Sequence, residues 1–187
     1  MNLPNRVTVG RMLLAVVLFI LLGTVCTEAG PIWYLAFTIY LVTVISDGLD
    51  GYLARSRNQI TTFGRIADPF ADKIVICGVL VLTTANPLTA SLVPTWIVLL
   101  VLAREFLVSG LRGFLEGRGQ SFSAKWQGKL KLVIQAVYCG AILFYPGSQF
   151  DWVEWIAHTF LWLTAAITVF SGLSYVRAAA RLLAEET

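Results

Sequence analysis

The chemistry of this sequence is concentrated in residues 47–73, DGLDGYLARSRNQITTFGRIADPFADK, which lie between two apolar runs. The stretch holds four aspartates, three arginines and a lysine. It contains neither histidine nor cysteine, and carboxylate oxygens are the ligands that hard cations such as Mg²⁺ and Mn²⁺ prefer. Two such ions about 3.5–4 Å apart assist displacement at phosphorus in many enzymes. The residue types therefore predict a two-metal site that acts on a phosphate ester or pyrophosphate.

Helical spacing predicts that the four carboxylates converge. Asp47 and Asp50 are three residues apart, and Asp68 and Asp72 are four residues apart, so each pair occupies one face of a helix. If the two helices are antiparallel neighbours, both faces can meet. Carboxylates deep in a bilayer cost roughly 2.5–3.5 kcal/mol on insertion scales, and four together repel one another, so bound cations are expected. The alternative for each single aspartate is a helix cap or an ion pair with a nearby arginine.

The elements that must position these residues are membrane spans. Of the 187 residues, 57% are hydrophobic and 13% are charged, which is too apolar for an ordinary soluble domain. A helix needs about 20 apolar residues to cross a hydrocarbon core about 30 Å thick. The sequence thus predicts an all-α, polytopic membrane protein with one domain over residues 1–187. Its six expected transmembrane helices cover residues 8–27, 31–54, 67–86, 92–114, 128–146 and 151–177.

Basic residues predict the orientation of these spans. All but Arg104 of the 14 Lys and Arg residues fall on one side of the membrane if the chain starts in the cytoplasm, and the opposite loops contain none. This asymmetry predicts that both termini and the acidic stretch are cytoplasmic. The net charge of +3 then reflects membrane topology, and nucleic acid is not expected as a partner.

The first span has an alternative interpretation. Arg6 and Arg11 precede an apolar run over residues 12–26, as charged residues precede the apolar part of a signal peptide. Val25 occupies the position where a lipoprotein signal has a small residue before Cys26, and further spans follow. We therefore expect the first segment to be retained as a span.

The fixed residues of the acidic stretch resemble a known signature. They spell DxxDGxxAR, then eight residues, then GxxxDxxxD, which is similar to the signature of the CDP-alcohol phosphotransferases, a family of integral membrane enzymes with six spans. The matching residues are Asp47, Asp50, Gly51, Ala54, Arg55, Gly64, Asp68 and Asp72. The resemblance covers most of the chain and is densest between residues 47 and 73.

Three further segments resemble the bacterial branch of this family that uses sn-glycerol 3-phosphate as its acceptor. They are NLPNRVTVGR at residues 2–11, REFLVSGLR at 104–112 and GKLK at 128–131. One departure is Leu132, where that branch has a threonine. The resemblance implies transfer of a phosphatidyl group from CDP-diacylglycerol to sn-glycerol 3-phosphate, with release of CMP. It also implies Mg²⁺ or Mn²⁺ as cofactor, a location in the bacterial inner membrane, and association into homodimers as is common in the family.

The resemblance also implies roles for individual residues. Asp47, Asp50 and Asp68 would be metal ligands, and Asp72 would be both a ligand and the general base for the acceptor hydroxyl. The CDP-diacylglycerol site would be formed by Gly51, Arg55 and Gly64, covered by Asn5 and Thr8.

Cations of the fourth and fifth spans are the expected site for the acceptor phosphate. Arg104 and Arg112 are eight residues apart, which keeps them within about 80° of one helix face. An arginine inside a span is a functional hypothesis by default, and the alternative for Arg104 is an ion pair with Glu105. Lys129 and Lys131 either complete this site or follow the positive-inside rule.

Two other functions are compatible with the sequence. The same chemistry could serve another acceptor, such as phosphatidylglycerol, inositol phosphate or serine. A cation transporter could use the aspartates as a relay, but transport favours polar residues near the membrane midplane and a path to the outer side. The outer halves of the predicted spans are almost free of charge, which favours the enzyme.

Overall fold

The computed structural model describes residues 3–56, 62–117 and 126–184 of the chain, with side chains for residues 9–24, 26–46, 70, 73–114, 117, 128 and 130–180. Within these ranges every regular element is helical. The elements are α1 (Leu3–Ile20), a π-helical turn η1 (Leu21–Val25), α2 (Ile32–Ser56), α3 (Thr62–Thr84), α4 (Thr95–Gly117), α5 (Trp126–Ser148) and α6 (Asp151–Ala184). Each predicted span corresponds to one α-helix, so the all-α prediction is confirmed.

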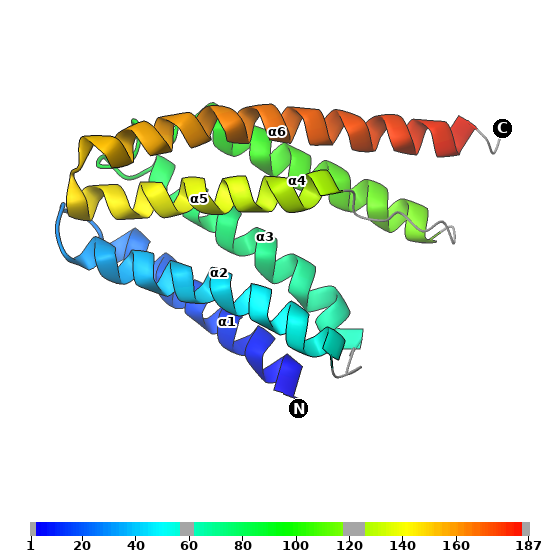
Figure 1. Ribbon diagram of the computed structural model, residues 1–187, viewed down its shortest axis with the longest axis horizontal. Helices are drawn as coiled ribbons and strands as arrows, with labels where there is room; N and C mark the ends of the chain where they lie inside the picture. Colours follow the sequence, from blue (N-terminus) through cyan, green and yellow to red (C-terminus); the bar gives the residue numbers. More distant parts are fainter. Residues whose placement is uncertain (1–2, 57–61, 118–125, 185–187) are drawn as a thin grey trace.

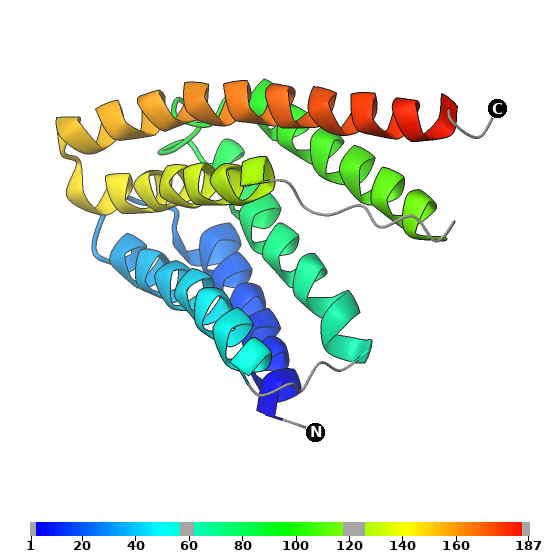
Figure 2. The ribbon, with the colours of Figure 1, turned by 45° about the vertical axis from the view of Figure 1, so that its right-hand side comes forward.

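The helices form a bundle with two distinct ends. The connections α1–α2, α3–α4 and α5–α6 gather at one end, on the left of Figure 1, which we call the loop end. The last turns of α2 and the first turns of α3 lie at the opposite end, which we call the motif end. Helix α5 packs against α2, α3 and α6, and α4 packs against α3 and α6. Figure 2 shows the α1–α2 pair and α3 diverging from α4, α5 and α6 toward the motif end.

Several helix boundaries differ from the predicted ones. Helix α4 begins at Thr95 and not at residue 92, because Pro94 has no N–H and suits a position at the start of a helix. Helix α3 begins at Thr62, five residues before the predicted start at Ala67, so Gly64 lies inside the helix. Helix α6 continues to Ala184 and is 34 residues long, the longest of the described helices.

The end of α1 contains a feature that hydrophobic periodicity does not predict. Leu21–Val25 forms a π-helical turn, in which the Cys26 N–H donates to the Leu21 carbonyl at 3.0 Å. The Thr24 hydroxyl donates to the Ile20 carbonyl at 2.6 Å, which satisfies a second carbonyl of the same turn. The wider turn closes α1 before the chain reverses into α2.

Hydrogen bonds from side chains to main-chain carbonyls close the loop end. Asn86 Nδ2 donates to the Cys26 carbonyl at 2.6 Å and thereby joins the α3–α4 connection to the end of α1. Trp33 Nε1 donates to the Glu28 carbonyl at 3.0 Å, and the Tyr138 hydroxyl donates to the Leu92 carbonyl at 2.6 Å. Buried polar groups need such partners, so these bonds let aromatic side chains fill the core without leaving a polar atom unsatisfied.

The outward faces of the helices are apolar. Phe106 and Trp155 are each 75% exposed, and Leu99 is 63% exposed. Soluble monomers rarely expose many large apolar side chains on contiguous faces, whereas lipid accommodates them. The outer surface therefore suits a protein that lies in a membrane.

Two helical segments are long and apolar enough to cross a membrane, Leu130–Ser148 and Asp151–Ala180. Three shorter apolar helical segments, of 10–17 residues, cover Val9–Thr24, Ile32–Ser46 and Lys73–Thr84. In the described part of the chain the six helices are thus present, but only two of them reach the full length and apolarity of a span.

Candidate functional site

The acidic motif is divided between two consecutive helices at the motif end. Asp47 and Asp50 lie in the last turns of α2, and Asp68 and Asp72 lie roughly two and three turns inside α3. Both segments are continuous α-helix, so the spacing of three and four residues does place each pair on one helical face. The side chains of all four aspartates lie outside the described residues, and their convergence stays a prediction.

Other predicted residues are placed by their backbone alone. Gly51 and Arg55 lie in α2, Gly64 in α3, and Asn5 and Thr8 in the first turns of α1. Lys129 lies in the first turn of α5. Only the helical backbone of these six residues is described. Among the described side chains, no group of three or more His, Cys, Asp or Glu residues could hold a metal ion. The side chains of the four aspartates are not among those described.

Arg104 is a buried arginine held by groups from two helices. Its side chain is 8% exposed. Nη1 donates to Glu105 Oε1 at 3.1 Å, and Nε donates to Ser171 Oγ on α6 at 3.2 Å. The guanidinium carbon lies 5.4 Å from the ring centroid of Tyr175, within reach of a cation–π interaction. The ion pair with Glu105 is confirmed, and binding of a substrate phosphate by Arg104 stays a prediction.

Glu105 accepts from a second cation on a different helix. Lys131 Nζ of α5 donates to the same carboxylate oxygen, Oε1, that accepts from Arg104. The Lys131 and Glu105 side chains are each 8% exposed. The structure therefore brings together two of the four residues that we predicted for the acceptor phosphate, Arg104 and Lys131, and it joins them through a carboxylate.

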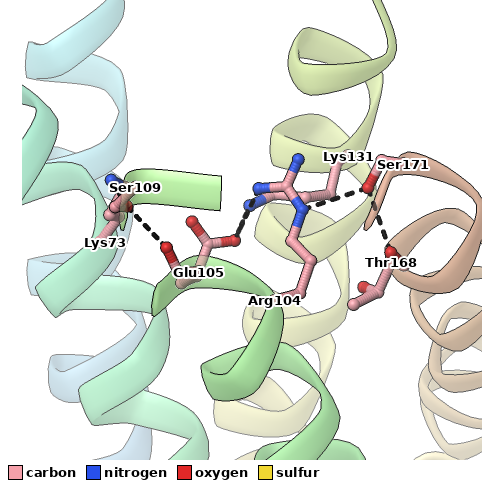
Figure 3. A network of polar contacts seen from close by, with 7 residues as sticks. All are labelled: Lys73, Arg104, Glu105, Ser109, Lys131, Thr168 and Ser171. Atoms are coloured by element: carbon pink, nitrogen blue, oxygen red, sulfur yellow. Dashed lines mark hydrogen bonds and ion pairs between the residues drawn. The ribbon is translucent and has the colours of Figure 1, made fainter. Parts of the chain in front are cut away.

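The same turn of α4 is also connected to α3. Lys73, the residue that follows Asp72, donates from Nζ to Ser109 Oγ at 2.5 Å. The Ser109 hydroxyl in turn donates to the main-chain carbonyl of Glu105 at 2.6 Å. We call Lys73, Arg104, Glu105, Ser109, Lys131 and Ser171 the Glu105 cluster (Figure 3). It joins α3, α4, α5 and α6 at one level of the bundle.

Arg112 lies two turns closer to the motif end than Arg104. Its Nε atom is buried and has no hydrogen-bond partner among the described residues. A buried cationic donor without a partner costs free energy, which a bound anion would recover. This observation supports the prediction that Arg112 contacts an anionic ligand.

A polar face of α6 was not predicted from the sequence. Thr164, Thr168, Ser171 and Tyr175 follow one another at intervals of four, three and four residues, and all are buried. Such spacing lies on one helix face. The face packs toward α4 and α5 and supplies the contacts of Ser171 and Tyr175 to Arg104. The spacing of these polar residues within an apolar helix is the signal that would have identified them.

One isolated histidine belongs to the loop end. His158 Nε2 lies 3.8 Å from Glu154 Oε1, one turn earlier in α6, and both side chains are exposed. This contact lies within α6, near the end of the bundle opposite the acidic motif.

An apolar groove of about 570 Å³ runs between α2, α5 and α6. Its walls include Phe37 and Val44 of α2, Val133 and Val137 of α5, and Ile156 of α6. The lining suits a hydrocarbon chain, because polar atoms contribute almost none of it.

Known proteins resemble this chain over nearly its whole length. A protein of Bacillus subtilis (strain 168) is 34% identical over 184 residues, which cover 93% of each chain. A Rickettsia typhi protein is 33% identical over 181 residues, covering 95% of this chain and 96% of its own. A Shigella flexneri serotype 5b protein is 32% identical over 184 residues, covering 95% and 94%. All three carry the name CDP-diacylglycerol–glycerol-3-phosphate 3-phosphatidyltransferase.

A family match agrees with these relatives. Residues 1–170 match the family described as CDP-alcohol phosphatidyltransferase. The match includes every residue of the acidic motif and the whole Glu105 cluster except Ser171. The chain therefore belongs to the CDP-alcohol phosphatidyltransferase family.

Proposed function

We propose that this protein transfers the phosphatidyl group of CDP-diacylglycerol to sn-glycerol 3-phosphate, giving phosphatidylglycerophosphate and CMP. The observation that carries the proposal is the complete acidic motif on the consecutive helices α2 and α3, in a chain that matches the named relatives over at least 93% of its length. The reaction is a step of phospholipid biosynthesis.

The donor set fits a hard divalent cation. Asp47, Asp50, Asp68 and Asp72 would hold Mg²⁺ or Mn²⁺, because all four are oxygen donors and each pair shares a helix face. When bound, two such ions would polarise the pyrophosphate of CDP-diacylglycerol and neutralise charge on the departing CMP. All four of these aspartates lie within residues 47–73, and no other acidic residue does. This stretch is therefore the best candidate for the metal site.

The remaining residues of the motif bind and orient the nucleotide-activated lipid. Arg55 would contact the phosphates of CDP, since a guanidinium pairs with phosphate through two donors. Gly51 and Gly64 leave room for the nucleotide to approach the helix backbone. Asn5 and Thr8 of α1 would cover the same site. The groove between α2, α5 and α6 suits an acyl chain of this substrate.

The acceptor reacts through one of its two free hydroxyl groups. Asp72 would take the proton of that hydroxyl as its oxygen attacks the phosphorus that bears the diacylglycerol. The bond from this phosphorus to the CMP oxygen breaks, and CMP departs with the electron pair. Arg104, Arg112, Lys129 and Lys131 would hold the acceptor's phosphate group, and two of them meet at Glu105.

The proposed setting is the bacterial inner membrane. The six helices would all cross it, with both termini and the active site at the cytoplasmic face and with residues 1–187 as one domain. Apolar outward faces and the one-sided distribution of basic residues support this topology. A homodimer is compatible with these faces.

Turnover by the purified protein tests the proposal. The protein in detergent receives CDP-diacylglycerol, Mg²⁺ and, one at a time, glycerol 3-phosphate, phosphatidylglycerol, inositol phosphate or serine. We expect CMP release and a phosphatidylglycerophosphate product with glycerol 3-phosphate. CMP release with only another acceptor would assign a different substrate, and no release by folded protein with any acceptor would refute the proposed chemistry.

A further inference from the structure

We infer that Glu105 is a positioning residue for the acceptor phosphate, which holds Arg104 and Lys131 at one point and acts only through them. The inference rests on the proposed function, because it concerns the phosphate of the same acceptor. A carboxylate repels a phosphate, so Glu105 itself is not expected to touch the substrate. Its contribution is to arrange two cations that come from different helices.

The contacts show why the two cations need a common partner. Arg104 Nη1 and Lys131 Nζ both donate to Glu105 Oε1, although Arg104 is next to Glu105 on α4 and Lys131 lies 26 residues further along the chain, on α5. Two positive side chains in a buried site repel one another, and each has many rotamers. A shared carboxylate oxygen offsets the repulsion and selects one rotamer of each chain before substrate binds. Such preorganisation reduces the cost of ordering the site during binding.

The two cations depend on Glu105 to different degrees. Arg104 is also held by Ser171 at 3.2 Å (Figure 3). Its guanidinium carbon lies 5.4 Å from the ring centroid of Tyr175. Ser171 is itself fixed, since its hydroxyl donates to the Thr168 carbonyl at 3.2 Å. For Lys131, Glu105 is the one hydrogen-bond partner recorded among the described residues. Loss of the Glu105 charge should therefore release Lys131 more than Arg104.

Glu105 also lies in the turn of α4 that is connected to the acid-bearing helix. Ser109 Oγ accepts from Lys73 of α3 at 2.5 Å and donates to the Glu105 carbonyl at 2.6 Å. Through Ser109 and the Glu105 turn, the two cations are thus connected to the helix that carries Asp68 and Asp72. A positioning residue in this turn would therefore set the distance between the acceptor's phosphate and Asp72, the proposed base for the acceptor's hydroxyl.

Steady-state kinetics with three variants tests the inference. Glu105→Gln keeps the shape and one acceptor oxygen but removes the charge, and Glu105→Asp keeps the charge. We expect Glu105→Gln to raise KM for glycerol 3-phosphate about tenfold, with KM for CDP-diacylglycerol changed less than about twofold, and Glu105→Asp to recover part of the loss. The control Glu154→Gln removes a glutamate charge at the loop end and should change neither KM.

A double-mutant cycle tests whether Glu105 acts through Lys131. In a Lys131→Met background, adding Glu105→Gln should change KM for glycerol 3-phosphate by less than about threefold, because the group it positions is already gone. Independent, multiplicative effects would overturn the inference. So would a Glu105→Gln variant with unchanged KM, or one whose Tm falls while both KM values and kcat worsen equally, as for a purely structural residue.

Inorganic phosphate provides a readout that does not need turnover. It should raise the Tm of the wild-type protein and of Glu105→Asp, and raise that of Glu105→Gln much less. Equal shifts for wild type and Glu105→Gln would overturn the inference. If wild-type protein shows this phosphate effect and Glu105→Gln loses it, yet no CMP forms with glycerol 3-phosphate, then the positioning role stands and the proposed acceptor is wrong.

Discussion

The two ends of the bundle use their polar side chains differently. At the loop end, Asn86, Trp33 and Tyr138 each donate to a main-chain carbonyl, and every one of these bonds is neutral. In the Glu105 cluster, toward the motif end, side chains bind one another and the contacts involve full charges. Neutral bonds to the backbone fix a fold. Buried charges are costly unless they are paired, and inside a membrane span they usually mark a functional site.

This difference predicts where substitutions affect stability and where they affect activity. Changes at the loop end should lower the free energy of unfolding and leave the substrate constants unchanged. Changes at the motif end should alter substrate constants by more than their effect on stability. Four substitutions, taken from the largest expected effect to the smallest, test the division.

Asp72→Asn should have the largest effect. The amide cannot accept the proton of the acceptor hydroxyl, so we expect kcat to fall about 10²–10⁴-fold, the usual contribution of a general base. Binding of CDP-diacylglycerol, measured separately by equilibrium titration, should persist. Loss of lipid binding together with turnover would instead make Asp72 mainly a ligand that builds the metal site.

Arg112→Ala should weaken the acceptor specifically. The buried Nε of Arg112 has no partner among the described residues, so removing the side chain should raise KM for glycerol 3-phosphate about 10–100-fold, as for a lost charged hydrogen bond of roughly 1.5–3 kcal/mol. KM for CDP-diacylglycerol should stay within about twofold. Arg177→Ala, at an exposed arginine of α6, is the matched control. Equal changes in both Michaelis constants would remove Arg112 from the acceptor site.

Gly78→Ala should destabilise the packing of α3 against α1. A Cβ at Gly78 would overlap the ring of Phe19 on α1, and overpacking of this kind costs about 1–3 kcal/mol. We expect a lower Tm in detergent with unchanged KM values. Gly23→Ala is the control, because its Cβ would meet Leu82 Cδ2 at an ordinary 3.9 Å. A Gly78→Ala variant as stable as Gly23→Ala would show that Phe19 moves without cost.

Asn86→Ala should have the smallest effect. It removes the bond from Nδ2 to the Cys26 carbonyl and the bond that Oδ1 accepts from the Leu88 N–H. Each is worth about 0.5–1.5 kcal/mol, and no substrate constant should change. Asn86→Asp keeps the acceptor and loses the donor, so its stability should lie between those of wild type and Asn86→Ala. A change in either KM would break the division between the two ends.

The helices could be predicted from the sequence because long apolar runs alternate with short polar connections. Their boundaries could not be predicted as well. The start of α3 at Thr62 lies in a stretch whose charged residues hide the helical period, and the π-helical turn at Leu21–Val25 leaves no mark on hydropathy. Six spans were predicted, and among the described residues two helical segments have the full length and apolarity of a span.

The candidate site divides in the same way. The acidic motif could be read directly, because its residues are close in sequence and their spacing carries the helical geometry. The pairing of Lys131 with Glu105 could not be predicted, since it depends on how the bundle places α5 relative to α4. One signal was available: Glu105 is the single carboxylate of the predicted span 92–114, and an acid at that depth needs a cation on a neighbouring helix.

The length of α6 has a practical consequence. With 34 residues at about 1.5 Å each, the helix is about 51 Å long and exceeds a hydrocarbon core about 30 Å thick by roughly 20 Å. If it starts at the outer surface and crosses without tilting, its last turn, which ends at Ala184, lies beyond the hydrocarbon core. The last turns of α6 would then act as a rigid spacer between the membrane and a fluorescent reporter fused after them, which favours this end of α6 for labelling.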